Sequence, residues 1–282
     1  MNPKGTLIIV GGAEDKGEDR TKSQILNEGA QDMEILKVLL PTDIPDARME
    51  VITTASNDPE GVKTKYQEAF RKLGYKNVGF HHIDERLQAR DEKMLKRLEE
   101  AHTIFLSGGD QFRLSTILGG TPVSDLLQKK YMQEKDFILA GTSAGAMAMS
   151  KVMIQLGGTR EALFEEDLHT TAGLGMLNDC IVDTHFVARG RFGRLAHAAV
   201  VNPGCLGIGL GEDTAMIIRK GTQAECFGTG MVVIIDGRDI THTNVYKVTS
   251  GLPIYVENLK VHLLVKGCRF DLKEVKMISE PE

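Results

Sequence analysis

The sequence lacks the features that mark nucleic-acid-binding, membrane-spanning and nucleotide-binding proteins. Its formal net charge is −5, so it has no basic surplus to meet a phosphate backbone. No apolar run reaches the roughly 18 residues of a transmembrane helix. The Gly-Gly-Ala-Glu-Asp segment at 11–15 is not a complete GxGxxG pattern, and no phosphate-binding loop ending in Lys-Ser/Thr is present. We therefore expect no nucleic-acid partner, no membrane association and no nucleotide cofactor.

Cysteine is scarce, and its spacing is not that of a metal site or a disulfide framework. The four cysteines are widely separated and form no CxxC pair: Cys180, Cys205, Cys226 and Cys268. We expect small buried apolar residues in a reducing compartment. The first residues lead directly into a strand without an apolar leader, which favours a cytoplasmic location. No metal or other cofactor is expected.

The pattern over the first two-thirds of the chain is that of an α/β protein. The 282 residues include 41% hydrophobic residues, enough for a sizeable core. Apolar runs predict strands at 6–10, 49–53, 78–82, 103–107 and 137–141, and helical patterns fall at 23–40, 61–73 and 91–101. This alternation predicts a mostly parallel sheet with helices on both faces. Because no linker or repeat is visible, we expect a single domain over residues 1–282.

The last third of the chain has a different pattern. Short apolar runs at 206–210, 215–219, 223–227 and 231–235 are separated by Gly-containing turns. These signals predict an antiparallel meander, added to the parallel sheet from about residue 215. The Gly-rich segment 156–176, with Glu165, Glu166 and Asp167 inside it, is expected to be a long loop near the functional site.

Ser143 is the strongest candidate for a chemical role. The segment Gly-Thr-Ser-Ala-Gly at 141–145 follows an apolar strand and fits the G-x-S-x-G turn that raises a nucleophilic serine above a sheet. The small neighbours allow the following helix to approach closely, and the N–H of Ala144 could stabilise an oxyanion. The alternative is a tight turn in which Ser143 only caps that helix.

A nucleophilic serine needs a base and an orienting acid. His185 follows an apolar strand and is the preferred base, because sites in open α/β sheets gather at strand carboxyl ends; His169 is its main competitor. Glu212 follows the strand 206–210 and could orient the base. Asp213 and Asp183 are alternatives for that acid, and any lone acid could instead serve a turn or cap.

Two further segments could complete the site. The glycines at 108–109 would let the backbone N–H of Gly109 or Asp110 form the other half of an oxyanion hole, unless they simply shape a strand-to-helix turn. Arg189, Arg191 and Arg194 follow the candidate base. Guanidinium groups suit bidentate capture of a carboxylate, although an exposed helix would carry such charges without any function.

These motifs together resemble the cyanophycinases. The resemblance covers nearly the whole chain and is carried by Gly-Gly-Asp-Gln at 108–111, Gly-Thr-Ser-Ala-Gly-Ala at 141–146, Asp-Thr-His-Phe at 183–186 with Arg-Gly-Arg-Phe-Gly-Arg-Leu at 189–195, and Gly-Ile-Gly-Leu-Gly-Glu-Asp-Thr-Ala at 207–215. Cyanophycinases are serine exopeptidases of the peptidase E-like group, and they release β-Asp-Arg dipeptides from cyanophycin, an arginine-decorated polyaspartate. The resemblance implies a class I glutamine amidotransferase-like fold, cyanophycin or β-Asp peptides as substrate, and a homodimer.

The resemblance also assigns roles to individual residues. It implies Ser143 as nucleophile, His185 as base and Glu212 as the third member. Arg191 and Arg194 would contact substrate carboxylates. Gln111, Asp183, Thr184 and Arg189 lie in the matching segments and are further candidates for substrate binding. The family pattern is Asp-Gln-His-Phe, so Thr184 is a departure that bears on specificity.

Three functional hypotheses follow from these motifs. The first is a Ser-His-Glu peptidase that acts on cyanophycin through an acyl-enzyme. The second is a peptidase E-like dipeptidase for other Asp-containing peptides, and the third is a non-catalytic protein that holds acidic peptides. For the first, Glu165, Glu166 and Asp167 could meet the substrate guanidinium, unless they form a solvated loop tip.

Overall fold

Two β-sheets organise the chain. A computed structural model describes residues 2–17, 31–41, 44, 47–158, 163–247 and 252–281. The strands are β1 (Thr6–Val10), β2 (Met49–Ile52), β3 (Val78–His81), β4 (Thr103–Leu106), β5 (Ile138–Thr142), β6 (Val152–Gly157), β7 (Leu168–Ala172), β8 (Cys180–Asp183), β9 (Leu206–Leu210), β10 (Thr214–Arg219), β11 (Gln223–Gly228), β12 (Val232–Asp236), β13 (His242–Thr243), β14 (Val256–Glu257), β15 (Lys260–Leu264), β16 (Arg269–Asp271) and β17 (Lys276–Ser279). The helices are α2 (Glu34–Val38), α3 (Pro59–Lys72), α4 (Glu92–Glu99), α5 (Gln111–Leu118), α6 (Pro122–Gln133), α7 (Ala144–Met147) and α8 (Phe192–Val201), with short 3₁₀ turns η1 (Gln88–Arg90) and η2 (Glu165–Asp167).

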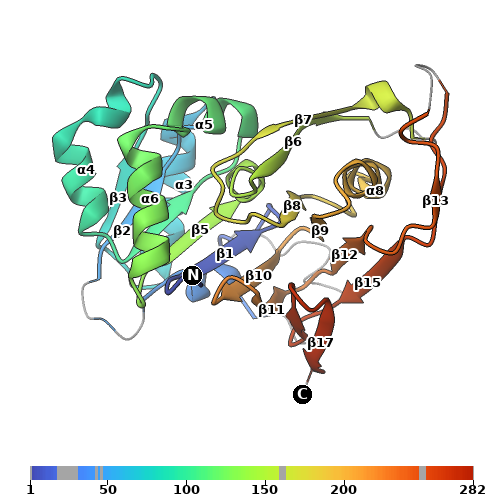
Figure 1. Ribbon diagram of the computed structural model, residues 1–282. Coiled ribbons are helices and arrows are strands. Elements are labelled where there is room, and N and C mark those ends of the chain that lie inside the picture. Colours follow the sequence, from blue (N-terminus) through green and yellow to red (C-terminus); the bar gives the residue numbers. More distant parts are fainter. Residues whose placement is uncertain are drawn as a thin grey trace.

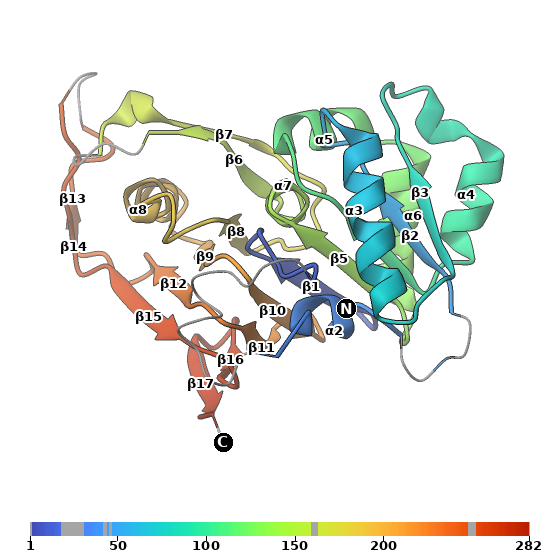
Figure 2. The ribbon, with the colours of Figure 1, turned by 180° about the vertical axis from the view of Figure 1, so that it is seen from behind.

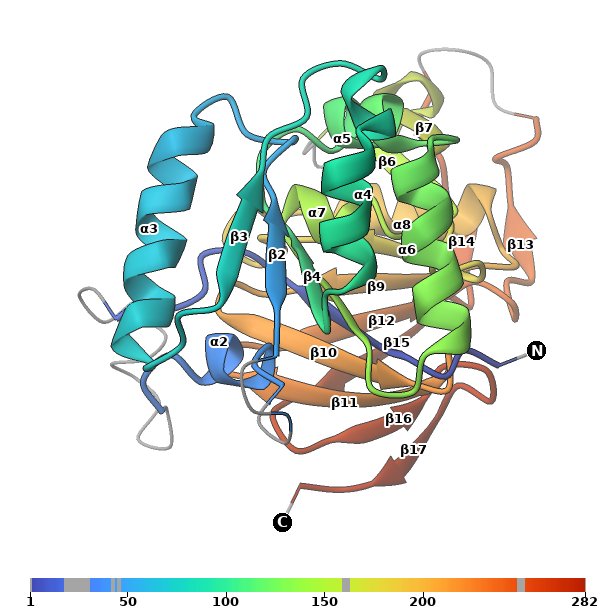
Figure 3. The same ribbon diagram turned by 90° about the vertical axis from the view of Figure 1, so that its left-hand side faces the viewer.

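The larger sheet confirms the expected α/β class. Its nine strands run in the order β17-β16-β11-β10-β1-β5-β4-β2-β3. Strands β1, β5, β4, β2 and β3 pair in parallel, whereas β10, β11, β16 and β17 add antiparallel strands beside β1. Helices cover both faces of the parallel part, with α3 on one face and α4 and α6 on the other (Figure 3).

The helices lie on both faces because the strands are apolar on both faces. Ile8 and Val10 of β1 belong to a buried cluster with residues of α2 and α3, which Figure 2 shows in front of the sheet. Leu7 and Ile9 belong to the cluster on the other face, with residues of α4, α5 and α6. Successive side chains of a strand point to opposite faces, so an unbroken apolar run is stable only between two layers.

The antiparallel C-terminal extension is confirmed, but its strands do not form the single meander that we expected. Strands β10 and β11 form a hairpin in the large sheet, whereas β9 and β12 pair in a second sheet of order β15-β12-β9-β8. Between β9 and β10 the chain does not form a hairpin but crosses from one sheet to the other, with Asp213 at a φ of 47°. Turn residues mark where strands end, but they do not determine which strands pair.

Residues 156–176, which were expected to form a long loop, are partly in β-strands. The segment contains most of a β hairpin, formed by β6 and β7, that reaches past α8 toward β13 (Figure 1). Beyond this arm, the N–H of Ile254 donates to the carbonyl of Leu163 at 2.7 Å. The glycines hid the strand signal of Leu168–Ala172. Residues 159–162 and most of the expected helix at 23–40 lie outside the described residues, and only α2 of that helix is seen.

Within the described ranges, no helix combines the length and the apolar character that crossing a membrane requires.

Candidate active site

Ser143 lies on a strained turn at the carboxyl end of β5. The strand ends at Thr142, α7 begins at Ala144, and Ser143 between them has a φ of 50° and a ψ of −116°. Left-handed backbone is rare for residues with a side chain and is concentrated at functional sites. A Cβ added to Gly145 would lie 2.2 Å from the carbonyl oxygen of Leu106, so only glycine allows α7 to sit this close to β4. These features match the nucleophile turn expected from the sequence.

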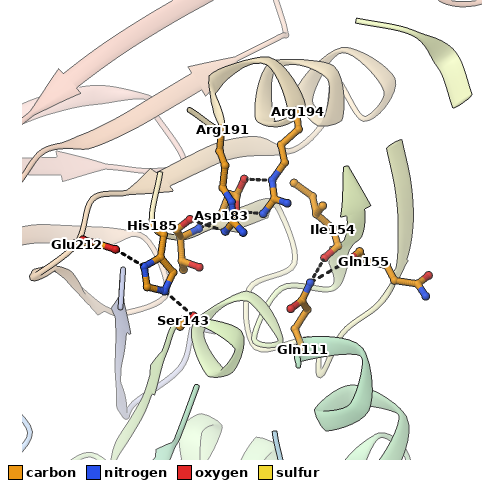
Figure 4. Close-up of polar contacts among 10 residues, drawn as sticks. Gln111, Ser143, Ile154, Gln155, Asp183, His185, Arg191, Arg194 and Glu212 are labelled. Atoms are coloured by element: carbon orange, nitrogen blue, oxygen red, sulfur yellow. Dashed lines mark hydrogen bonds and ion pairs between the residues drawn. The ribbon is translucent and has the colours of Figure 1, made fainter. Parts of the chain in front are cut away.

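The three residues expected to act together are in one hydrogen-bonded series (Figure 4). Ser143 Oγ lies 3.0 Å from His185 Nε2, and His185 Nδ1 lies 2.7 Å from Glu212 Oε1. His185 follows β8 and Glu212 follows β9, so the two residues come from neighbouring parallel strands of the second sheet. The imidazole is mostly buried, whereas the side chain of Glu212 is 39% exposed. Both distances suit proton transfer from serine to an oriented imidazole.

The turn after β1 holds all three segments in place. The N–H groups of Ser143, His185 and Asp213 donate to the carbonyls of Val10, Gly11 and Gly12, at 3.0, 2.8 and 2.9 Å. Gly12 has a φ of 93°, and a Cβ there would lie 2.4 Å from His185 Nε2. In the sequence, this Gly-Gly pair was informative only as an incomplete nucleotide-binding pattern. Its position directly after the first strand was the signal that it shapes the site.

The competing candidates for base and acid lie elsewhere. His169 is exposed on β7, in the arm formed with β6. Asp213 accepts hydrogen bonds from the N–H of Asp15 at 3.1 Å and from Thr229 Oγ1 at 2.9 Å, so its carboxylate serves the surrounding loops. Asp183 belongs to a separate ion cluster, which leaves Glu212 as the acid on His185.

Two backbone N–H groups next to Ser143 can serve as an oxyanion hole. In the described part of the chain, the N–H groups of Gly109 and Ala144 donate to no protein acceptor. A Cβ on Gly108 would lie 3.3 Å from the Cβ of Ser143, so this turn lies against the serine. The alternative oxyanion-hole donor, the N–H of Asp110, is not available, because it donates to the carbonyl of Ala55 at 2.8 Å. The carboxylate of Asp110 caps α5.

Arg191 and Arg194, which were expected to contact substrate carboxylates, instead bind a carboxylate of the protein itself, that of Asp183. Asp183 is fully buried and is bound by Arg194 through Nε at 2.6 Å and through Nη2. Arg191 Nη1 lies 3.2 Å from the same carboxylate and 2.7 Å from the carbonyl of Thr184 (Figure 4). We call Asp183, Arg191 and Arg194 the arginine cluster. Burial lowers the pKa of Arg191 to about 10, with Asp183 opposing the shift and Arg194 adding to it, so it remains charged at neutral pH.

Gln111 and Thr184, two other candidates for substrate contact, are placed differently from each other. The side-chain amide of Gln111 donates to the carbonyls of Ile154 and Gln155 at 3.2 and 3.0 Å, which ties α5 to the β6–β7 arm. Thr184 is fully buried, and its hydroxyl has no hydrogen-bond partner in the described structure. The geometry therefore gives Gln111 a structural role.

Arg189 alone among the three arginines faces the open cavity at the serine. This Ser143 cavity has a volume of about 390 Å³, and its lining includes Ser143, His185 and Arg189. Four charged or polar side chains that sequence reasoning missed also line it: Glu14, Lys16, Lys65 and Tyr66. They come from the loop after β1 and from α3, outside the segments that carry the family resemblance, and only the fold brings them to the serine. Glu166 and Asp167 are not part of the lining, and the side chain of Glu165 lies outside the described structure.

The site contains a serine, an imidazole and a carboxylate in one hydrogen-bonded series, and two N–H groups without a described acceptor lie beside the serine. These are the groups that a serine hydrolase uses for catalysis. The fold and the site together therefore define the protein as a serine hydrolase.

Comparisons with known proteins give the family. The chain belongs to peptidase family S51, whose profile matches residues 7–226. It is 37% identical to the cyanophycinase of Synechococcus elongatus over 96% of this chain and 80% of that protein. It is 32% identical to the cyanophycinase of Geminocystis herdmanii, over 96% and 94% of the two chains. The protein is therefore a peptidase.

Solved structures agree on the fold. A peptidase from an acI-B1 actinobacterium superposes with a TM-score of 0.65 at 21% identity, over 96% of this chain and 98% of that one. A putative peptidase E protein from Listeria monocytogenes gives a TM-score of 0.52 at 18% identity, over 80% and 99%. The peptidase E-like fold implied by the sequence motifs is thereby confirmed.

Proposed function

We propose that the chain is a serine exopeptidase that degrades cyanophycin, the arginine-decorated polyaspartate, to β-Asp-Arg dipeptides. The observation that carries the proposal is the Ser143–His185–Glu212 series in a chain that is 37% identical to a cyanophycinase. A binding protein would have no need for a strained serine at 3.0 Å from an oriented imidazole. This favours catalysis over simple retention of acidic peptides.

The geometry supports the following reaction. Ser143 Oγ attacks the scissile carbonyl carbon while His185 Nε2 takes the hydroxyl proton, and the N–H groups of Gly109 and Ala144 stabilise the oxyanion. The C–N bond then breaks, and the imidazolium returns the proton to the leaving amine. A water molecule, deprotonated by the same nitrogen, hydrolyses the acyl-enzyme and restores the serine. Throughout, Glu212 orients the imidazole through Nδ1.

Purified cyanophycin provides the test. Incubation with the enzyme should release β-Asp-Arg as the main soluble product, identified by mass and by comparison with an α-linked Asp-Arg standard. A matched reaction with the Ser143→Ala variant should release none. Release of no dipeptide by the folded wild-type protein, or equal release by the variant, would refute the proposal. Cleavage of small Asp-containing peptides alone would point to a dipeptidase instead.

We further propose that the protein is cytoplasmic and forms a homodimer. All four cysteines are free thiols, as a reducing compartment requires. The edge strand β15 exposes Val261 and Leu263, followed by Val265, and edge strands with apolar side chains favour pairing with another chain. Light scattering should give twice the chain mass of 30.9 kDa. A monomer at micromolar concentration would exclude the dimer, and cell fractionation tests the location.

We also propose that residues 1–282 fold as one domain, since a single buried cluster contains side chains of both sheets. One cooperative unfolding transition would support this, and two separate transitions would exclude it.

A further inference from the structure

The Ser143 cavity is lined by more cationic than anionic side chains among the described residues, and two of its three cations lie outside the sequence motifs. Three cationic side chains line it: Lys16 from the loop after β1, Lys65 from α3, and Arg189. Among the described residues that line it, Glu14 is the one carboxylate. What the cavity can bind depends on how much of this positive charge Glu14 neutralises.

Glu14 is occupied on every side. It is 4% exposed, its Oε2 accepts from Thr142 Oγ1 at 2.6 Å, and its Oε1 accepts from the hydroxyl of Tyr66 and lies 3.0 Å from Lys16 Nζ. Burial alone would raise the pKa of Glu14. Lys16 and the two hydroxyl donors outweigh burial and hold the pKa below its ordinary value. The Glu14 carboxylate therefore stays charged, and its negative charge is matched by Lys16.

Lys16 is fixed by these contacts, and one of its three donors has no acceptor among the described residues. An ammonium group has three N–H donors. One reaches Glu14 Oε1 at 3.0 Å, a second reaches the main-chain carbonyl of Glu14 at 3.2 Å, and the ring of Tyr66 lies 5.0 Å away. The side chain is 20% exposed, so the remaining donor is available where Lys16 lines the cavity.

Lys65 and Arg189 add positive charge that no described residue pairs with. Neither forms an ion pair with any other residue in the described ranges, and both are exposed. Lys63, two positions earlier on the same helix, pairs with Glu60 at 3.1 Å. With Glu14 matched to Lys16, two positive charges of the lining remain for a ligand.

We propose that Lys16, Lys65 and Arg189 form a subsite for a free carboxylate of the substrate, with Lys16 as its fixed donor. This rests on the proposed function, and it assigns a specificity role to two residues of the β1–α3 region. In arginine-decorated polyaspartate, the side-chain carboxyls are joined to arginine. The free carboxylates are then those of the branch arginines and the one at the end of the main chain. A cationic subsite beside the serine that selected the chain end would favour cleavage there.

The test uses a short synthetic oligomer of β-Asp-Arg in four forms: unmodified, amidated at the main-chain end, amidated at the branch arginines, and amidated at both. Lys16→Gln should raise KM for the unmodified oligomer about tenfold, as loss of a hydrogen bond to a charged group does. Lys65→Ala should raise it about threefold, because its charge is more exposed. We expect kcat to be unchanged, and Lys63→Ala to match the wild type.

The amidated forms identify the carboxylate. The single amidation that removes the difference between wild type and variants marks the group that the subsite binds. If either variant keeps the wild-type KM for the unmodified oligomer, or loses as much on the fully amidated one, the subsite is wrong. Because Lys65 is exposed, its variant is expected to fold even if Lys16→Gln does not.

Binding without turnover separates this proposal from the proposed function. Calorimetry with the β-Asp-Arg dipeptide compares Ser143→Ala with Ser143→Ala/Lys65→Ala. Weaker binding to the double variant supports the subsite even if the wild-type enzyme cleaves no polymer. Equal binding overturns the subsite even if the polymer is cleaved.

Discussion

The arginine cluster and the Ser143 cavity both place cations near His185, but they use charge in different ways. In the cluster, Asp183 is fully buried and binds both guanidinium groups, so the cations are held by the protein itself. In the cavity, Glu14 matches only Lys16, and two further cations have no partner in the described structure. Cations close to a catalytic motif in sequence are thus not necessarily the ones available to a ligand.

The two regions also differ in origin. The cluster comes from β8 and the start of α8, next to the motif that carries His185. The cavity cations come mainly from the β1–α3 region, on the sheet face that carries Ile8 and Val10. Ser143, at the end of β5, lines the cavity and contacts His185, which precedes the cluster arginines in the sequence. The comparison predicts that the cluster contributes mostly to stability and the cavity mostly to substrate affinity.

Removing the nucleophile should have the largest effect. Ser143→Ala and His185→Ala should each lower kcat by about 10⁴–10⁶-fold, and the double variant should lose little more, because members of one catalytic unit are strongly non-additive. Steady-state kinetics on β-Asp-Arg oligomers measures this, with circular dichroism as the control for folding. Losses that simply multiply would show that His185 does not activate Ser143.

The next largest effect should be a loss of folding stability when the arginine cluster is disrupted. Asp183→Asn leaves two guanidinium groups without their carboxylate, and breaking a buried pair in this way costs about 3–5 kcal/mol. The matched change in the cavity, Lys65→Ala, should alter the free energy of unfolding by no more than about 0.5 kcal/mol. Urea unfolding of both variants makes the comparison. If the two variants were equally stable, the claim that the cluster contributes to stability and the cavity to substrate affinity would be wrong.

A further prediction concerns pH and Glu14. Its folded pKa is lowered below the ordinary value of 4.5, so its stabilising contribution is fully present above pH 4.5 and is lost as the pH falls further. Glu14→Gln should therefore be less stable than the wild type at pH 7, by about 1–3 kcal/mol. The difference should narrow below pH 4.5. Thermal unfolding across pH 3–7 measures it, and a gap that widens in acid would contradict the account.

The sequence predicted the parallel half of the fold because its signals are local. Strands β1 to β5 are short, mostly apolar runs between helical patterns, and their boundaries fall within a residue or two of those expected. The pairing of β9 and β12 in a second sheet was not predictable, because hairpin turn signals do not identify partners across the chain. The β6–β7 arm was missed because its glycines resemble those of a loop.

The site shows the same limit. Ser143, His185 and Glu212 each follow a strand, so their meeting at the carboxyl ends of strands could be expected from topology. Lys16 and Lys65 carry no motif, and their place in the cavity depends on how α3 packs against the loop after β1. The pairing within the arginine cluster was not predicted, because Asp183 appeared in the sequence as an alternative to Glu212 for the acid on His185, whereas it binds Arg191 and Arg194.

The most direct test of the central claim is the intact mass of the protein after reaction with a fluorophosphonate. We expect one covalent adduct, located by peptide mapping on Ser143, that is absent from Ser143→Ala and forms far more slowly in His185→Ala. A folded wild-type protein that forms no adduct, or a Ser143→Ala variant that is labelled equally well, would contradict the account.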